Sequence, residues 1–542
     1  MNLTDYQQSI FTRATSRSDT NVMTIRGYAG SGKTHTVVEI IKAYASRRQG
    51  VLVLAPTAAA LGVIKKKIKD QVSTDTISFR TLASLMKSPV ETFNVKNSKG
   101  EILFSAPLNK KGSQQITGFM NKLGANDMEL DALKEFEKVI PFDYATGEQN
   151  KVVTEYDIDL RQASSLFNRK LGVDEKNLSI TTEFILNEAD VIARSIAKYN
   201  CLIIDEMSMV DREDSTRLQE AIELCKANEV GPGNSLQSIF VGDRSQLQPV
   251  NGKINKFMIQ EPDHEDVFEL VDILRSSDDI ARLGHLINQG TNIFELQKAY
   301  SDQIHRHDDQ IDAFIKNHID ELSSSDVTIS FTNHYVDKVN KAVRQHLGYK
   351  SSLVNNEVLM VTSNTFAKSS EGNDIIFSNG ESVKVEKIYS TEDVEKMLEC
   401  KTFEFREAYR KSYSEYQLNE AKAINAGGYF NLIRVKSMDN DTASRLMWVP
   451  HDLKYNNRDL TFRRQKKALN TLAEYNEGEI PVLDAKYGYA RTIHKSQGSE
   501  WNKVCVILSD NDIRHHPESK QLLYTGVTRA REQLSVHIIR KY

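Results

Sequence analysis

The sequence predicts an α/β protein with doubly wound parallel sheets, and three observations favour this class. Short apolar runs such as "VLVLAPT" (51–57) and "SIFVGD" (238–243) end in small or polar residues, as buried parallel strands do. A glycine-rich loop at 27–34 lies between an apolar run and an amphipathic helix pattern. The chain of 542 residues is several times the size of one domain, so several domains are expected. Two later apolar runs, at 328–333 and 503–510, predict that one of them is a second α/β domain.

The composition is that of a globular protein, with 39% hydrophobic and 27% charged residues and no low-complexity tract. The N-terminal "MNLTDYQQSI" has no basic start followed by an apolar stretch, and no run of about 18 apolar residues occurs, so we expect neither a signal peptide nor a membrane segment. The cysteines form no C-x-x-C pair; they are Cys201, Cys225, Cys400 and Cys505. They indicate neither a disulfide framework nor a zinc site, and a reducing cytoplasm fits them best.

The charge of the chain predicts no overall basic surface, because the formal net charge is −4 and the isoelectric point is near 6.4. Any binding of nucleic acid must therefore be local. Two basic clusters, Lys65–Lys69 and Arg463–Lys467, are candidates for contact with phosphate, although solvated helix faces explain them as well.

The segment "GYAGSGKT" (27–34) matches the pattern G-x-x-x-x-G-K-[ST] of a nucleotide-binding P-loop. Its glycines let backbone N–H groups point at phosphate oxygens, at the positive end of the dipole of the following helix. We expect Lys33 to neutralise the β and γ phosphates and the Thr34 hydroxyl to ligate Mg²⁺. The alternative is a tight turn that is glycine-rich for other reasons. The predicted nucleotide contacts in the loop are Gly27, Ala29, Gly30, Ser31, Gly32, Lys33 and Thr34.

A second motif, "NCLIIDEMSMV" (200–210), puts two carboxylates at the end of an apolar strand. Such a strand end faces the ligand crevice of an open α/β sheet. We expect Asp205 to hold Mg²⁺ through water and Glu206 to orient and deprotonate the attacking water. The alternative is that the pair caps the next helix.

A P-loop with an acidic strand occurs in switches, kinases, transporters, clamp loaders and helicases, so the remaining segments decide the class. Their order resembles superfamily 1 helicases, specifically the 5′ to 3′ group that includes the bacteriophage Dda helicase and the RecD-type helicases. The resemblance implies two RecA-like P-loop NTPase domains with inserted accessory domains. The segments that carry it are Leu3–Gln7, Ala55–Ala60, Thr76–Met86, Asp205–Val210, Val241–Val250, Glu269–Ser277, Ile329–Asn340, Thr492–Trp501 and Leu522–Arg531.

The resemblance also implies roles at the nucleotide. Gln7 resembles the glutamine that reads adenine, and Gln246 resembles the γ-phosphate sensor. Arg275 and Arg529 match the two arginines that reach the γ-phosphate from the second α/β domain, where cations stabilise the charge of phosphoryl transfer. Each arginine taken alone could be an ordinary surface ion pair. The resemblance adds Gly498 and Glu500 to the nucleotide-binding positions.

For DNA, the resemblance implies a groove across both domains that contacts the sugar-phosphate backbone and tolerates any base sequence. Relatives commonly carry histidine where Phe79 stands, so Phe79 is a candidate for base stacking. For His494 the alternative is a buried neutral histidine bonded to backbone. The implied DNA contacts are Pro56, Thr57, Phe79, Thr332, Asn333, Thr492 and His494.

Two insertions are expected. The segment Val90–Pro107 alternates like a β-hairpin, and in the resembled family a hairpin here is the pin that splits the duplex, with Phe104 or Phe93 as the junction aromatic unless both pack the hairpin. Helical patterns follow at 128–140 and 188–199. Later, alternating runs at 356–363, 380–390, 427–437 and 445–452 suggest the SH3-like small β-barrel that the family carries, interrupted by a helical stretch at 391–424.

The expected domains follow from these placements. They are a first RecA-like domain at 1–88 and 199–262, an inserted pin domain at 89–198, a second RecA-like domain at 263–348 and 483–542, and an inserted SH3-like domain at 349–482.

The resemblance predicts an ATP-dependent DNA helicase, with ATP and Mg²⁺ as cofactors and 5′ to 3′ movement on single-stranded DNA. The alternatives are an RNA translocase of the same superfamily and a helicase-like clamp subunit of a nuclease complex. We expect single-stranded DNA and DNA forks as partners, with single-strand binding, replication or recombination proteins besides. We expect no membrane, a monomer, and a bacterial or phage-infected host cytoplasm.

Overall fold

The structure is a computed structural model that describes residues 3–16, 22–69, 71–98, 101–140, 151–227, 236–249, 253–259, 266–272, 279–369, 372–390, 430–438, 443–450, 453 and 480–540. The chain forms two compact units. The larger consists of Met1–Leu85 and Glu188–Tyr542, and the smaller of Met86–Asn187. None of the helices in the described ranges is long and apolar enough to cross a membrane.

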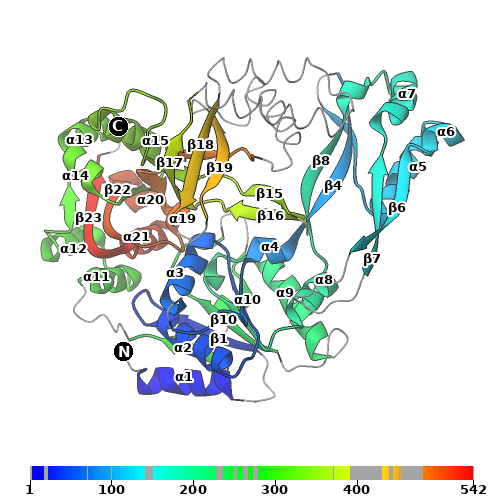
Figure 1. The fold of residues 1–542 in the computed structure, drawn as a ribbon. Helices are drawn as coiled ribbons and strands as arrows, with labels where there is room; N and C mark the ends of the chain where they lie inside the picture. Colours follow the sequence, from blue (N-terminus) through cyan, green and yellow to red (C-terminus); the bar gives the residue numbers. More distant parts are fainter. Residues whose placement is uncertain are drawn as a thin grey trace. The chain divides into compact units, whose positions relative to one another are not determined.

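The larger unit contains a six-stranded parallel sheet, and we call the part built on it the first lobe (Figure 1). The strand order is β11-β1-β10-β9-β2-β3. Strand β11 pairs with β1, from Thr24 opposite Val267 to Gly27 opposite Leu270. Residues 267–270 therefore belong to this sheet, whereas the sequence predicts that the second domain starts at 263. The strands are β1 (Val22–Gly27), β2 (Val51–Ala55), β3 (Ile77–Thr81), β9 (Cys201–Ile204), β10 (Gln237–Gly242) and β11 (Val267–Leu270).

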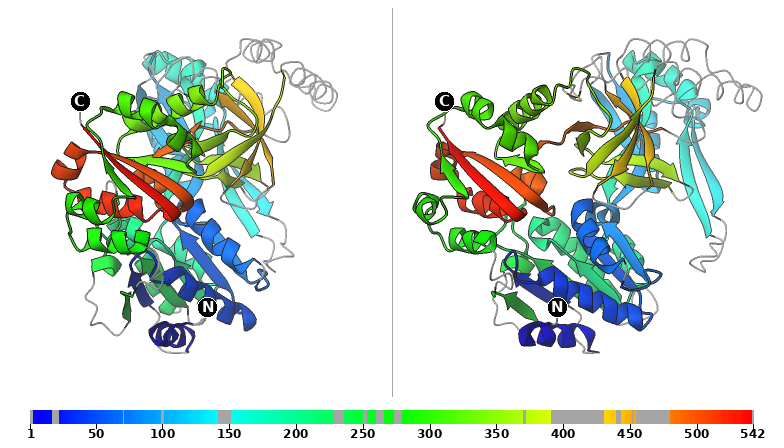
Figure 2. Two further views of the ribbon diagram at one scale, coloured as in Figure 1. Left: turned by 90° about the vertical axis from the view of Figure 1, so that its left-hand side faces the viewer. Right: turned by 60° about the vertical axis from the view of Figure 1, so that its left-hand side comes forward.

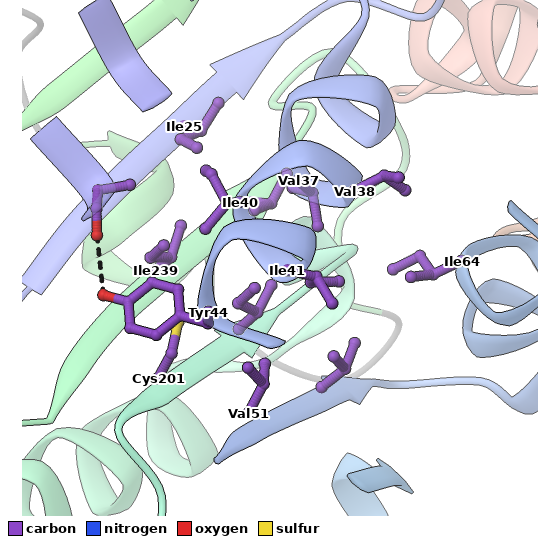
Figure 3. Packing of buried hydrophobic residues seen from close by; sticks show 14 of the residues in the cluster. Ile25, Val37, Val38, Ile40, Ile41, Tyr44, Val51, Ile64, Cys201 and Ile239 are labelled. Atoms are coloured by element: carbon purple, nitrogen blue, oxygen red, sulfur yellow. Dashed lines mark hydrogen bonds between the residues drawn. The ribbon is translucent and has the colours of Figure 1, made fainter. Parts of the chain in front are cut away.

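Helices pack on the first sheet because the strands are apolar on both faces. Ile203 of β9 and Ile239 of β10 belong to the core cluster beneath α2, whereas their neighbours Leu202 and Phe240 are buried on the opposite face. Figure 3 shows side chains of α2 packed over the strands. This core holds the helix that follows the P-loop. The helices of the lobe are α1 (Asp5–Thr15), α2 (Lys33–Ser46), α3 (Ala58–Ile68), α4 (Leu82–Met86), α8 (Ala189–Ile196), α9 (Arg212–Lys226) and α10 (Lys256–Ile259).

A five-stranded sheet, in the order β12-β23-β22-β13-β21, forms the second lobe of the same unit, and all its pairings are parallel. Alternate residues of β22 serve two cores, Val504 and Val506 on one face and Cys505 and Ile507 on the other. Figure 2 shows helices on both sides of these strands. The strands are β12 (Ile304–Arg306), β13 (Val327–Ser330), β21 (Ala490–Thr492), β22 (Trp501–Ser509) and β23 (Ala530–Ile539).

Helices of the second lobe divide between the two cores. Helices α11, α12 and α21 contribute to one cluster, and α13, α14 and α15 contribute to the other. Two parallel sheets with helices on both faces confirm the predicted α/β class. The helices are α11 (Asp279–Asn288), α12 (Ile293–Ala299), α13 (Ile311–Asn317), α14 (Ile319–Ser324), α15 (Asn333–His346), α19 (Ile493–Ser496), α20 (Asp510–His515) and α21 (Ser519–Val527).

An antiparallel sheet in the order β19-β18-β17-β14-β20 contains the four alternating runs predicted as strands. Its SH3-like character stays a prediction, and the helical stretch at 391–424 and the basic cluster Arg463–Lys467 lie outside the described residues. The strands are β14 (Val358–Val361), β17 (Ser382–Ile388), β18 (Phe430–Ser437), β19 (Arg445–Pro450) and β20 (Ala485–Tyr487), with a separate hairpin of β15 (Thr365–Ser369) and β16 (Gly372–Phe377).

The smaller unit is built on two antiparallel sheets, β5-β4-β8 and β6-β7, and contains the predicted hairpin. The helix pattern at 128–140 is wrong beyond Leu130, because β6 pairs with β7 along its whole length, and this pairing overrides the helical spacing of its apolar residues. The elements are β4 (Lys87–Lys96), β5 (Ile102–Pro107), α5 (Lys110–Lys122), α6 (Asp127–Leu130), β6 (Leu133–Ile140), β7 (Lys151–Ile158), α7 (Leu160–Leu171) and β8 (Leu178–Leu186).

The second helical pattern, at 188–199, forms α8, which contacts α9 of the first lobe. The compact insertion therefore ends at Asn187 rather than at residue 198.

The hydroxyl of Tyr44 donates a hydrogen bond of 2.9 Å to the backbone oxygen of Ala14, which joins α2 to the end of α1 (Figure 3). Because Tyr44→Phe leaves that buried oxygen without its partner, we expect it to lower the free energy of unfolding by about 1–2 kcal/mol. Thermal or urea unfolding measures the change. The matched control is Tyr199→Phe in the same lobe, since no described residue hydrogen-bonds the Tyr199 hydroxyl; an equal loss in both variants would contradict the assignment.

Candidate nucleotide site and nucleic-acid interface

The P-loop connects the end of β1 to the start of α2, and its shape requires glycine. Gly30 and Gly32 have φ angles of 82° and 86°, in the left-handed region where other L residues are strained. Gly32 is the N-cap of α2, and no side chain caps this 14-residue helix. The first N–H groups of α2 are therefore available to an anion, and the helix dipole favours negative charge there.

The residues around the loop fit a triphosphate. The Lys33 ammonium donates hydrogen bonds of 2.7 and 2.9 Å to the backbone oxygens of Gly27 and Tyr28, within the loop itself. Two buried polar atoms, Ser31 Oγ and Gln246 Oε1, have no hydrogen-bond partner among the described residues. Buried polar atoms are normally hydrogen-bonded, so these two indicate a site that a polar ligand or water completes.

Two carboxylates follow β9 at the carboxyl edge of the first sheet. Asp205 is buried, and its Oδ1 accepts a hydrogen bond of 3.0 Å from the Glu206 N–H. Glu206 has a φ of 53°, which is uncommon for a residue other than glycine and is often found at functional sites. Burial raises the pKa of both groups, that of Glu206 to about 7, and the positive charge of Lys33 opposes this shift. Carboxylate oxygens at this strand end are ligands of the type that Mg²⁺ prefers.

Arg529 of the second lobe lies close enough to Glu206 for its charge to lower the pKa of that carboxyl. The guanidinium is buried and is held by its own lobe, donating to the backbone oxygens of Thr525 at 3.0 Å and Ser499 at 3.2 Å. The structure thus brings Lys33, Asp205, Glu206 and Arg529 into one electrostatic neighbourhood. Arg275, the other predicted arginine, lies outside the described residues.

Tyr524 on α21 links the two lobes directly. Its hydroxyl accepts a hydrogen bond of 2.8 Å from the backbone N–H of Ala29 in the P-loop and donates one of 2.7 Å to Asp243 Oδ2, after β10. Tyr524 and Asp243 are both buried. Both residues lie in motif segments, Asp243 in Val241–Val250 and Tyr524 in Leu522–Arg531. The sequence predicts no role for either residue, because nothing in the local pattern shows that they contact each other.

The segment after β10 also enters the second lobe. Leu247 is fully buried in the core cluster of that lobe, its N–H donates to Thr525 Oγ1 at 3.1 Å, and its carbonyl accepts from Gln497 Nε2 at 3.0 Å. Gly498, with a φ of 75°, lies so close to the first lobe that a Cβ would be 2.6 Å from Thr57 Oγ1. These contacts fix where the two lobes meet.

Two further predicted nucleotide residues are placed differently. Gln7 is buried beside the P-loop, where its side-chain nitrogen donates a 3.4 Å hydrogen bond to the backbone oxygen of Ser31. Glu500 is exposed and forms an ion pair of 3.0 Å with Arg531, although its charge also acts on Asp205. The structure therefore brings Gln7 to the loop and gives Glu500 a partner outside it.

Three of the predicted DNA contacts are threonines in equivalent positions. Thr57 and Thr332 follow the parallel strands β2 and β13, Thr492 is the last residue of β21, and each is the N-cap of the next helix. Such junctions present a hydroxyl and the N–H groups of a first helical turn at the carboxyl edge of the sheet. Pro56 precedes the first of them, and Asn333 is exposed at the start of α15.

The two rings predicted to contact DNA have protein neighbours. His494 is half-buried, and burial lowers its pKa, which favours the neutral ring. Phe79 is half-buried against the core of the first lobe, with the Lys65 ammonium 5.3 Å from its ring centroid. One ring face of Phe79 is therefore used for packing, and Lys65 of the first basic cluster lies over this aromatic ring.

The two hairpin phenylalanines have different environments. Phe93 is fully buried and lies against Phe167, with their ring centroids 5.8 Å apart, so it is a core residue and the proposed junction role is wrong for it. Phe104 is half-buried and stacks on Phe119, at 4.2 Å between centroids with rings nearly parallel. Phe104 stays the candidate junction residue.

Comparison with known proteins finds two family models, in the order of the two lobes. An AAA domain model matches residues 11–252, and a UvrD-like helicase C-terminal domain model matches residues 487–537. The first spans the P-loop, the acidic strand and β10, and the second spans β22, α21 and Arg529. The predicted enzyme class, an ATP hydrolase of the helicase type, is supported by both models.

Relatives among curated proteins are distant. An uncharacterised protein of Methanocaldococcus jannaschii is 26% identical over 417 residues, 72% of this chain and 33% of that protein. An uncharacterised protein of Acanthamoeba polyphaga mimivirus is 24% identical over 401 residues, 64% of this chain and 76% of that protein. The RecD subunit of the RecBCD enzyme of Buchnera aphidicola is 41% identical over 51 residues, 9% of this chain and 8% of that subunit. The chain thus spans a third of the archaeal relative.

Similar solved structures include the Pif1 helicase from Candida albicans, at 15% identity and a TM-score of 0.42, covering 100% of this chain and 96% of that one. Another is the Pif1 helicase from Bacteroides in complex with ADP-AlF3 and single-stranded DNA, at 17% identity and a TM-score of 0.44, covering 99% and 92%.

Replacing Tyr524 by Phe removes the hydroxyl that joins Ala29 N–H to Asp243, and leaves both buried groups without that partner. We expect kcat/KM for ATP hydrolysis to fall roughly 10-fold, since the loss of such a bond costs about 1–3 kcal/mol. Steady-state ATPase assays with saturating single-stranded DNA measure this. The control is Tyr489→Phe, which loses a hydroxyl bond of 3.2 Å to the Glu357 side chain outside the nucleotide site. An unchanged ATPase in Tyr524→Phe would show that the bridge does not matter.

Proposed function

We propose that this chain is a superfamily 1 helicase, an ATP-dependent DNA helicase that moves 5′ to 3′ on single-stranded DNA and unwinds the duplex ahead. One observation carries the proposal. Groups from two separate sheets, the P-loop and acidic strand of one and Tyr524 and Arg529 of the other, meet at the same place. A motor that couples hydrolysis to movement needs a nucleotide site shared by two lobes, because only then does the nucleotide state change how the lobes contact each other.

The chemistry follows from the residues at that place. Lys33 and the N-terminus of α2 bind the phosphates. The Ser31 hydroxyl and the side-chain Nε2 of Gln246 donate to phosphate oxygens, and Gln246 Oε1 accepts from water. Thr34 and Asp205 would hold Mg²⁺, which would neutralise negative charge on the bound phosphates. Glu206 orients the attacking water and accepts its proton. Arg529 stabilises the charge that develops on the transferred phosphoryl group, and the resemblance assigns the same role to Arg275, which lies outside the described residues.

Nucleotide binding is coupled to the lobes through the same contacts. Tyr524 occupies the Ala29 N–H and Leu247 lies in the core of the second lobe, so rearrangement of the P-loop around phosphate changes the contacts of both. We infer that the contacts between the lobes differ between the nucleotide-bound and the nucleotide-free state. The change from one state to the other then alters how tightly each lobe holds DNA during each cycle. Such a shift requires that the nucleotide binds the two arrangements with different affinity.

The nucleic-acid surface suits backbone rather than base contacts. The three threonine-capped junctions present hydroxyl and N–H groups, which bind phosphate oxygens without reading sequence. A cavity of about 1070 Å³ lies close to α15, and its lining has more basic than acidic side chains. Some of these basic side chains pair with carboxylates. A basic lining of this kind suits the backbone of single-stranded nucleic acid. The basic side chains are Lys338, Lys341, Arg344, Lys350, Lys486 and Lys495.

Substrate and direction are tested together with forked duplexes. We expect the full chain to unwind a fork with a 5′ single-stranded tail and to leave a duplex with only a 3′ tail intact. Stimulation of the ATPase by poly(dT) rather than poly(U) separates DNA from RNA, because backbone contacts alone barely distinguish the two sugars. Preference for poly(U) would favour the RNA translocase. DNA-stimulated hydrolysis without strand release would favour the clamp subunit.

Lys33→Ala removes the ammonium that we place at the phosphates. We expect ATPase and unwinding to fall on the order of 100-fold or more, because a fixed charge at the transferring group is lost, while binding of single-stranded DNA persists. Steady-state hydrolysis and fluorescence anisotropy with a labelled oligonucleotide measure the two properties. Lys42→Ala on the same helix, where the lysine pairs with Glu39, is the control and should leave both unchanged. Turnover retained in Lys33→Ala would refute the P-loop assignment.

Phe104→Ala removes the ring that we place at the fork. We expect unwinding to slow several-fold with near-normal DNA-stimulated ATPase, since stacking of a base on an aromatic ring contributes about 1–3 kcal/mol. Gel or stopped-flow unwinding assays compare it with Phe119→Ala, which breaks the same ring stack but leaves Phe104 in place. Equal slowing in both variants would show that Phe104 serves only to pack the unit.

A further inference from the structure

One edge of the second lobe gathers four histidines and one glutamate from separate elements. His305 lies in β12, His307 follows it, His318 lies between α13 and α14, Glu321 lies in α14 and His537 lies in β23. The ligand atoms of His318, Glu321 and His537 all lie within 4.8 Å of one another. Within the described ranges, no other group of three such side chains converges in this way. The nucleotide and DNA assignments above use none of these five residues.

The spacing of the three ligand atoms suits a tetrahedral ion. His537 Nε2 is 3.2 Å from Glu321 Oε1, and His318 Nδ1 is 3.6 Å from Glu321 Oε2. An ion with bonds of about 2.1 Å in tetrahedral geometry separates its ligand atoms by about 3.4 Å. The two observed separations lie on either side of this value, but they end on different oxygens of Glu321. A rotation of the Glu321 carboxylate that turns one oxygen toward both imidazoles would therefore complete the site.

Neighbouring side chains orient the two imidazoles. His537 is buried, and its Nδ1 lies 3.0 Å from Nε2 of His307, so a hydrogen bond holds the ring with Nε2 toward Glu321. The His318 ring stacks on Phe314 with centroids 4.6 Å apart. A hydrogen bond at the second nitrogen of a ligating histidine is the usual device that fixes its tautomer and orientation.

We propose that His318, Glu321 and His537 bind one divalent transition-metal ion, Zn²⁺ being the ion that suits them best, with water as the fourth ligand. Two imidazoles and one carboxylate form a recognised zinc ligand set, and nitrogen ligands disfavour Mg²⁺. On binding, the metal takes the place of the proton on His537 Nε2. Neutral His537 and His307 then each carry their proton on the other ring nitrogen, so His537 Nδ1–H donates to His307 Nε2 and no net proton is released.

The ion joins α14 and the turn before it to the end of β23. Strand β23 begins at Ala530, directly after Arg529, and His537 lies near its other end. The bound ion therefore fixes the end of β23 that is remote from Arg529. The site is a structural one, which stabilises the second lobe and takes no part in phosphoryl transfer. It also holds β23 near the edge strand β12, which pairs with it.

The experiment uses the metal-stripped full chain in millimolar Mg²⁺, so that the oxygen ligands of the nucleotide site are not available to zinc. Titration with Zn²⁺ against a chromophoric chelator is expected to give one equivalent with a Kd on the order of 1 µM or tighter. Co²⁺ should give the visible absorption of a tetrahedral site. Zn²⁺ should also raise Tm by roughly 5 °C.

Variants assign the ligands. His318→Gln and Glu321→Gln should each weaken Zn²⁺ binding by roughly 100-fold or more and abolish the Tm shift; both side chains are partly exposed, so folding does not depend on them. His307→Phe should weaken binding about 10- to 100-fold. The matched control is His346→Gln, which removes another histidine that contacts a carboxylate of α14, Asp320 at 3.3 Å, without a third ligand.

Several results would overturn the proposal. They are the absence of saturable binding by the wild-type chain, wild-type affinity in both His318→Gln and Glu321→Gln, and an equal loss in His346→Gln. None of these measurements depends on ATP hydrolysis or unwinding, so the proposal stands or fails separately from the proposed function.

Discussion

The hydroxyl of Tyr524 lies between the P-loop and Asp243, and the arrangement of the candidate site depends on this contact between two sheets. A P-loop alone binds nucleotide, but it does not transmit the nucleotide state to another lobe. Here the backbone N–H of Ala29 is bonded to a side chain of the second lobe, and Leu247 from the first lobe is part of the second lobe's core. The two lobes are therefore joined by buried groups, which are costly to separate unless other partners replace them.

The same structural device recurs at five of the places where the chain is expected to contact a ligand. A parallel strand ends in a polar residue, and that residue starts or precedes a helix at the carboxyl edge of the sheet. The P-loop follows β1, Asp205 follows β9, Thr57 and Thr332 follow β2 and β13, and Thr492 ends β21. The sheets supply rigidity, since their strands are buried on both faces, and the junctions supply hydrogen-bonding groups at the carboxyl edge of each sheet. The proposed zinc site lies elsewhere, and it stiffens the lobe without touching these junctions.

The sequence predicted the elements well where a motif or a strong pattern fixed the local structure. The strand, loop and helix at 22–46 and the hairpin at 90–107 have the predicted form. It failed where partners are distant: residues 133–140 have apolar residues at helical spacing but pair as a strand with β7, and residues 267–270 join the first sheet beside β1. Backbone pairing with a remote strand outweighs local preference, and the sequence of one segment does not contain its partner.

The sequence by itself determined the class of the site, because Lys33, Thr34 and the Asp205–Glu206 pair lie in local patterns whose geometry is set by a few neighbouring residues. Only the tertiary structure decided which side chains from distant segments complete it, as with Tyr524 and Asp243, and which phenylalanine of the hairpin is buried. The histidine cluster is the clearest case, since His318 and His537 are more than two hundred residues apart and the cysteine pattern gave no sign of zinc. Contacts of this kind arise from the packing of whole elements, and no short stretch of sequence specifies them.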